Sequence, residues 1–141
     1  MAVTAIAFTL ASALYTGFQW TIRVLVYPQF SRVGRPDFPD FERSHQRLVS
    51  YAVGPLFLAL GLSALALVAL PPAGVARWEA FAAIVPVGVI LSVTALLAVP
   101  LHGRLSAGFD EAAHRRLLAV DSIRLVAAVA ATVAAVAVLV A

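Results

Sequence analysis

Two short charged motifs hold the side chains most able to do chemistry. In each, a glutamate is followed three residues later by a histidine: Glu42 with His45, and Glu111 with His114. Side chains at this spacing share one face of a helix, so each pair could bind a metal ion together. A Glu-x-x-His pair from each of two helices is half of the ligand set of a di-iron site in a helical bundle. The four residues are therefore candidate metal ligands, and a metal ion is a candidate cofactor.

The motifs also allow two other interpretations. The carboxylates could simply offset nearby arginines on solvated helices beside a membrane, which requires no ligand. Alternatively, the arginines of the motifs could bind an anionic lipid or substrate head group. These are Arg43, Arg47, Arg115 and Arg116. A di-iron site would also need a carboxylate from each of the other two helices, and Asp121 is the best candidate for one of them. The ligand set is therefore short of acidic residues.

A second set of polar side chains lies within or beside apolar segments. Tyr15, Gln19 and Arg23 follow one another at intervals of four, and Tyr27 continues the series. This spacing predicts one polar stripe along a helix, although Arg23 could instead snorkel to the membrane interface. We predict ligand-binding roles for Gln19, Arg23, Tyr27 and Arg124, and candidate catalytic roles for His45, His102 and Asp121.

The elements that must position these residues follow from composition. The 141 residues are 62% hydrophobic and 12% charged, whereas soluble domains contain about 25% charged residues. A membrane span needs about 20 apolar residues, and four stretches qualify. They are residues 2–27, 48–70, 78–100 and 123–141. We therefore predict one all-α domain over residues 1–141, an antiparallel four-helix bundle with the lipid bilayer as partner and no nucleic acid.

The order of these features repeats along the chain. Pro28-x-x-x-Arg32 matches Pro100-x-x-x-Arg104, and each precedes one Glu-x-x-His motif. Residues 1–70 and 73–141 are therefore interpreted as two parallel hairpin repeats, with convergent amphipathic hairpins as the alternative. Arginines concentrate in the first and third connections, which predicts a protein of the cell membrane with these hairpins in the cytoplasm and both termini outside.

Several short motifs resemble one group of membrane proteins. They are Tyr27-Pro28-x-Phe30, Phe41-x-x-x-His45, Val99-Pro100-Leu101-His102 and Asp121-x-x-Arg124. The pattern resembles small four-helix bacterial membrane proteins of unknown function, which are distantly similar to the anthrone oxygenase-like group. The resemblance implies a membrane-embedded pocket for a hydrophobic, aromatic or quinone-like compound. It also implies that His45 and His102 are the functional residues.

These observations predict a membrane protein that binds a hydrophobic small molecule at a polar cluster on the cytoplasmic side. Oxidation of that molecule is an open second step, so the sequence does not decide whether the protein is an enzyme. One alternative is a small transporter or channel subunit, which would form a homo-oligomer because four helices are few for a complete pathway. Another is a structural accessory subunit that docks through its alanine-rich last helix.

Overall fold

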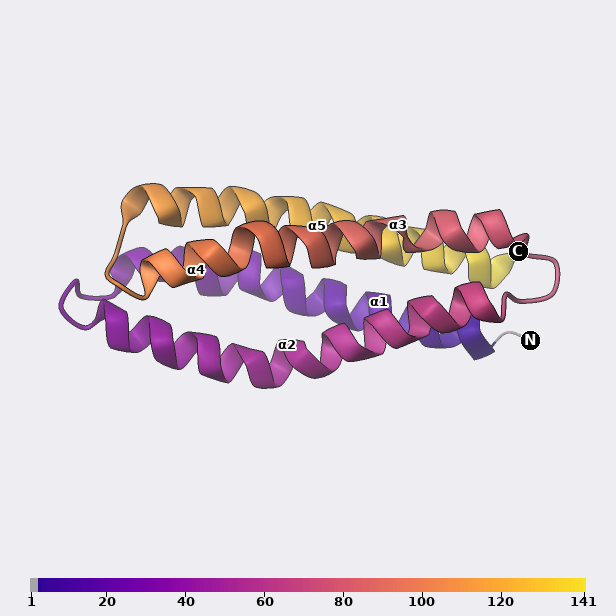
Figure 1. Ribbon diagram of the computed structural model, residues 1–141, viewed down its shortest axis with the longest axis horizontal. Helices are drawn as coiled ribbons and strands as arrows, with labels where there is room; N and C mark the ends of the chain where they lie inside the picture. The colour runs from indigo at the N-terminus through magenta and orange to yellow at the C-terminus, as the bar shows by residue number, and fades with distance from the viewer. Residues whose placement is uncertain (1–2) are drawn as a thin grey trace.

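The computed structural model describes residues 3–141, and this range is helical apart from its short connections. Four rods form an antiparallel bundle (Figure 1). They are α1 (Val3–Thr21) continued by η1 (Ile22–Val26) and η2 (Tyr27–Arg32); α2 (Phe38–Ala69); α3 (Arg77–Val93) continued by η3 (Thr94–Ala98) and α4 (Val99–Leu105); and α5 (Glu111–Val140). The predicted all-α four-helix bundle is confirmed.

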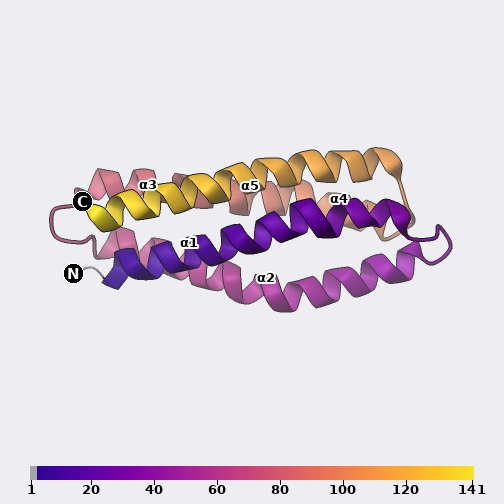
Figure 2. The same ribbon diagram turned by 180° about the vertical axis from the view of Figure 1, so that it is seen from behind.

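The arrangement of the rods brings the two charged motifs to one end. α1 packs against α2 and α5, while α3 packs against α5 and, less closely, against α2. The start of α1, the end of α5 and the link from α2 to α3 lie at one end of the bundle (Figures 1 and 2). The links from η2 to α2 and from α4 to α5 lie at the other end. The motifs begin α2 and α5, so both belong to this second end.

Two helices begin earlier than the predicted spans. α2 begins at Phe38 and α5 at Glu111, whereas the predicted spans began at residues 48 and 123. Each charged motif is therefore part of a long helix that continues into the apolar segment. The difference arises because hydropathy locates the hydrocarbon-facing part of a helix, while the helix itself extends into the polar region.

A capping residue explains where α5 begins. The carboxylate of Asp110 accepts hydrogen bonds from the backbone amides of Ala113 and Ala112, at 3.0 and 2.8 Å. These amides have no partner within the helix, so an aspartate at this position starts it effectively. The same bonds, that from Ala113 foremost, hold the pKa of Asp110 below its usual value. The cap is therefore strongest above the ordinary pKa of an aspartate and weakens as the pH falls through the lowered value.

Three helical segments are long and apolar enough to cross a membrane. They are Phe38–Ala69, Arg77–Leu105 and Glu111–Val140. This supports the prediction of a membrane protein. α1, with 19 residues, is not among them. The first of the four predicted spans therefore stays a prediction.

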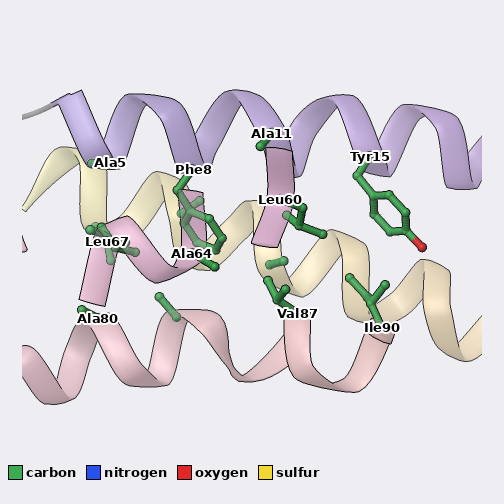
Figure 3. Packing of buried hydrophobic residues seen from close by; sticks show 14 of the residues in the cluster. Ala5, Phe8, Ala11, Tyr15, Leu60, Ala64, Leu67, Ala80, Val87 and Ile90 are labelled. Atoms are coloured by element: carbon green, nitrogen blue, oxygen red, sulfur yellow. The ribbon is translucent and has the colours of Figure 1, made fainter. Parts of the chain in front are cut away.

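Apolar side chains fill the half of the bundle nearer the termini. Figure 3 shows Phe8 of α1, Leu60 and Leu67 of α2, and Val87 and Ile90 of α3 pointing toward one another. α5 contributes mainly alanines to this core, and small side chains allow its backbone to lie close to α1 and α3. The buried polar side chains cluster closer to the other end.

Two π-helical turns occur where prolines interrupt the rods. η1 precedes Pro28 and η3 precedes Pro100, and the residue just before each proline donates its backbone N–H to the carbonyl five residues earlier, at Ile22 or Thr94. Proline lacks an N–H and its ring clashes with the carbonyl four residues back, so a wider turn relieves the conflict. The turns occupy equivalent positions in the two predicted repeats, although the repeat itself remains a prediction.

A third proline lies inside α2. Pro55 cannot donate a backbone hydrogen bond to the carbonyl of Tyr51, and its ring crowds that carbonyl. Both ribbon views show α2 bending near its middle (Figures 1 and 2). α2 also packs less closely on α3 and α4 than on α1. The bend matters for the site, because it lies beside the cavity that separates α2 from η3 and α4.

Candidate functional site

Four buried side chains of α1 and α5 form a closed ring of hydrogen bonds. The Tyr15 hydroxyl donates to Oε1 of Gln19 at 2.9 Å, and Nε2 of Gln19 donates to Oδ1 of Asp121 at 2.5 Å. Arg124 donates to the same Oδ1 at 3.4 Å and to the Tyr15 hydroxyl at 3.2 Å. Arg124 is 5% exposed and the other three are fully buried. The ring therefore ties α1 to α5 inside the bundle.

Two buried polar atoms of the ring residues make no hydrogen bond within the described structure. Among the atoms of residues 3–141, neither Oδ2 of Asp121 nor Nε of Arg124 has a hydrogen-bond partner, although both are buried. Unpaired buried polar atoms are costly and uncommon in folded proteins. The ring is thus able to accept one further donor and one further acceptor.

Arg23 lies beside this ring without belonging to it. Its Nε donates to the hydroxyl of Ser122 at 2.8 Å, and the side chain is half-buried. Ser122 follows Asp121 on α5, so the guanidinium of Arg23 faces α5. The predicted stripe of α1 therefore faces the bundle, and the hydrogen-bond partner of Arg23 is Ser122.

A second network joins a carboxylate, an imidazole and a phenol. Oε1 of the fully buried Glu42 lies 2.6 Å from Nδ1 of His102, and Nε2 of His102 lies 2.8 Å from the hydroxyl of Tyr27. Gln46 donates to Glu42 at 3.0 Å and to the Ser106 hydroxyl at 2.6 Å. An imidazole held between a carboxylate and a hydroxyl is able to accept the proton of that hydroxyl.

The remaining two histidines pack around Phe30. The ring centre of Phe30 lies 4.9 Å from that of His45 and 6.1 Å from that of His114. Nε2 of His114 lies 2.8 Å from the backbone carbonyl of Tyr27 and so fixes the start of η2. His45 stacks beside His102, with ring centres 5.9 Å apart. Both histidines therefore support the residues of the second network without belonging to its hydrogen-bonded chain.

The two Glu-x-x-His pairs have different surroundings. Glu42 contacts His102 in place of its sequence neighbour His45, whereas Glu111 is 68% exposed and pairs with Arg115 at 2.7 Å. Side chains three residues apart diverge by about 60° around a helix, which lets Glu42 turn to α4 and His45 to Phe30. Across residues 3–141 there is no group of three or more His, Cys, Asp or Glu that could hold a metal ion. The four candidate ligands are not brought together.

A cavity of about 220 Å³ lies between α2 and the segment formed by η3 and α4. Most of its wall is apolar and comes from Phe18, Val53, Phe57 and similar side chains. Its polar lining residues are Tyr27, Gln46, Ser50, Thr94, His102 and Arg124. The cavity thus meets both networks, because Tyr27 and His102 belong to one and Arg124 to the other. Ligand pockets usually measure about 300–1,000 Å³, so this one suits a single or fused ring.

Sequence reasoning gave no site role to several of these residues, among them Gln46 and Phe30. Gln46 lies one helical turn after Glu42, and that spacing was a usable signal for a hydrogen bond between them. Phe30 carried no such signal, because its role as the centre of an aromatic cluster depends on contacts between different helices.

The fold and the site together define an all-helical bundle of the membrane-protein class, with a partly polar cavity between its helices. Comparisons with known protein families, with curated proteins and with solved structures found no match. The resemblance to anthrone oxygenase-like proteins accordingly stays a hypothesis.

Proposed function

We propose that this protein binds a hydrophobic small molecule in the cavity between α2 and α4. The observation that carries the proposal is the meeting of both polar networks on one largely apolar cavity. Such a wall favours an apolar ligand, and a few fixed polar groups orient it. Tyr27, His102 and Arg124 are the orienting residues in this proposal.

A reaction at this site is the second part of the proposal. Oxidation of the bound compound is the open second step, and oxidations of aromatic hydroxyl compounds remove protons as well as electrons. The chain from Tyr27 through His102 to Glu42 is a suitable acceptor for a proton. Binding is therefore the primary function proposed, with proton removal as the contribution of the protein to any subsequent oxidation.

A cavity-filling substitution tests the binding proposal. Val53→Trp should weaken saturable binding of 1,4-naphthoquinone by at least about ten-fold, because the indole would occupy space in a cavity of only about 220 Å³. Val85→Trp is the matched control, since Val85 is 62% exposed on α3 and away from this cavity. Binding to protein in lipid nanodiscs is measured against empty nanodiscs. Equal binding by the two variants, or no saturable binding by the parent, contradicts the proposal.

We further propose that the charged end of the bundle faces the cytoplasm and that both termini lie outside. Support comes from the distribution of arginines. The end of the bundle that holds the η2–α2 and α4–α5 connections has several, whereas the opposite end has the single Arg77. Short basic connections are retained on the cytoplasmic side. The cavity is then entered from the membrane in its cytoplasmic half.

Two alanine-to-cysteine variants test the orientation in a chain that has no native cysteine. Ala73 and Ala107 are exposed in the connections at opposite ends. A membrane-impermeant maleimide should label the Ala73→Cys variant in intact cells and the Ala107→Cys variant only after permeabilisation. Ala73 is preferred to Gly74, whose φ of 92° disfavours a side chain. The opposite labelling pattern would reverse the proposed orientation.

A further inference from the structure

We propose that the Tyr27–His102–Glu42 chain is a general base for a ligand with an ionisable hydroxyl on an aromatic ring, a phenol or hydroquinone, and that Arg124 stabilises the resulting anion. This inference rests on the proposed function, because it assigns a chemical class to the molecule held in the same cavity.

The geometry of the chain fixes the direction of proton transfer. An ionised Glu42 only accepts hydrogen bonds, so Nδ1 of His102 carries the proton that lies between them at 2.6 Å. Nε2 of His102 is then an acceptor and takes the hydrogen bond of the Tyr27 hydroxyl at 2.8 Å. Glu42 is positioned to hold this tautomer and to stabilise the imidazolium that forms when Nε2 is protonated.

The proposed step is a double proton transfer. The ligand hydroxyl donates to the oxygen of Tyr27 at the cavity wall. The O–H bond of the ligand breaks as its proton passes to Tyr27, and the original proton of Tyr27 passes to Nε2 of His102. The products are a ligand anion, a neutral tyrosine and an imidazolium paired with Glu42. No electrons are transferred, so the step requires no oxidant.

The charges around the cavity favour that anion. Arg124 lines the cavity at 5% exposure, and its Nε has no hydrogen-bond partner within residues 3–141. Asp121 offsets this guanidinium only in part, since their closest contact is 3.4 Å and the same carboxylate oxygen also accepts from Gln19. Arg23 adds a second guanidinium nearby, bonded to Ser122. Arg124 and Arg23 outnumber the carboxylate of Asp121 here. Glu42 is paired with the imidazolium of His102 once the proton has moved, so these charges favour the charged form of an acidic ligand.

The other ionisable groups near His102 are few. Glu42 and His45 approach it from α2 and Tyr27 from η2, while Arg124 shares the cavity wall from α5. His45 stacks on His102 without a hydrogen bond between the rings in the described structure. Proton transfer from the cavity is therefore assigned to His102.

The test uses 4-nitrophenol, whose anion absorbs visible light, and nitrobenzene, which has a similar shape and no hydroxyl. Both are titrated against the whole protein in nanodiscs at a pH one unit below the ordinary pKa of 4-nitrophenol, where about a tenth of the free probe is ionised. We expect the ratio of anion to neutral probe to be at least about ten-fold higher in the bound state than in free solution. Nitrobenzene should bind without a spectral change of this kind.

Two variants remove the base and one serves as its control. His102→Gln and Tyr27→Phe should return the bound ratio to within about two-fold of that of the free probe, while nitrobenzene binding persists. Tyr51→Phe is the matched control for Tyr27→Phe, because Tyr51 is 73% exposed on α2 and does not line the cavity. It should retain the enrichment of the anion. Retained nitrobenzene binding shows that each variant still folds.

The outcomes separate the two proposals. If both probes bind but the parent shows no enrichment of the anion, or if His102→Gln and Tyr27→Phe keep it, the general base is refuted and the binding function stands. If neither probe shows saturable binding to the parent, both proposals fail.

Discussion

Replacing Arg124 with leucine should lower the free energy of unfolding by about 3–5 kcal/mol, the usual cost of breaking a buried ion pair. The substitution leaves the carboxylate of Asp121 buried with Gln19 as its remaining donor, and it removes the donor to the Tyr15 hydroxyl. Neither group reaches water while α1 and α5 stay in contact. Unfolding by sodium dodecyl sulfate in mixed micelles measures the change.

Two further variants give this prediction its control. The double variant Asp121→Leu with Arg124→Leu should recover most of the loss, because it removes both charges together. Arg23→Leu should cost less than Arg124→Leu, because Arg23 is half-buried and, within residues 3–141, hydrogen-bonded to Ser122 alone. Strictly additive losses in the double variant, or equal losses for Arg23→Leu and Arg124→Leu, would show that the ring does not stabilise the bundle.

The second large effect is expected at Glu42. In Glu42→Leu, Nδ1 of His102 loses its acceptor, whereas Gln46 keeps the Ser106 hydroxyl and the His102 carbonyl as acceptors. An unsatisfied buried donor costs about 1–3 kcal/mol. The matched substitution Glu111→Leu removes an exposed side chain that pairs with Arg115 on the surface, so a change within about 0.5 kcal/mol is expected.

The conservative variant Glu42→Gln separates hydrogen bonding from charge. Its amide oxygen still accepts from His102 or Gln46, so its stability should lie between those of the parent and Glu42→Leu. The same denaturant titration compares all of these proteins. Similar losses for Glu42→Leu and Glu111→Leu would mean that the buried glutamate contributes no more than its exposed counterpart.

The bundle and its polar residues could be predicted because they depend on local properties of the chain. Long apolar segments separated by charged connections require helices in lipid, and hydropathy locates those segments. Gln19, Asp121 and Arg124 were identified as candidates because polar residues within apolar segments are costly and therefore need partners. The structure provides those partners in one ring.

The partners themselves could not be predicted from spacing. The i, i+3 rule compares residues on one helix and therefore paired Glu42 with His45. The observed partner of Glu42 is His102, on another rod. Which residues of α2 and α4 meet depends on the π turn η3 and the bend at Pro55, and each of these rotates and shifts the residues that follow it. A single sequence contains no direct record of that rotation.

The cavity beside the bend of α2 has a further consequence for the proposed function, because its mouth lies on the side of the bundle. The cavity opens between α2 and the η3–α4 segment, on the long side of the bundle, where exposed Ser50 and Val99 flank it. In the proposed function, a ligand entering there would come from the lipid, so the relevant concentration would be the one dissolved in the bilayer. A compound that partitions into lipid about a thousand-fold gains about 4 kcal/mol of apparent affinity before it contacts any residue. Under the proposed function, the protein would select among dissolved lipophiles by their polar groups, and its contacts would need to supply only that discrimination.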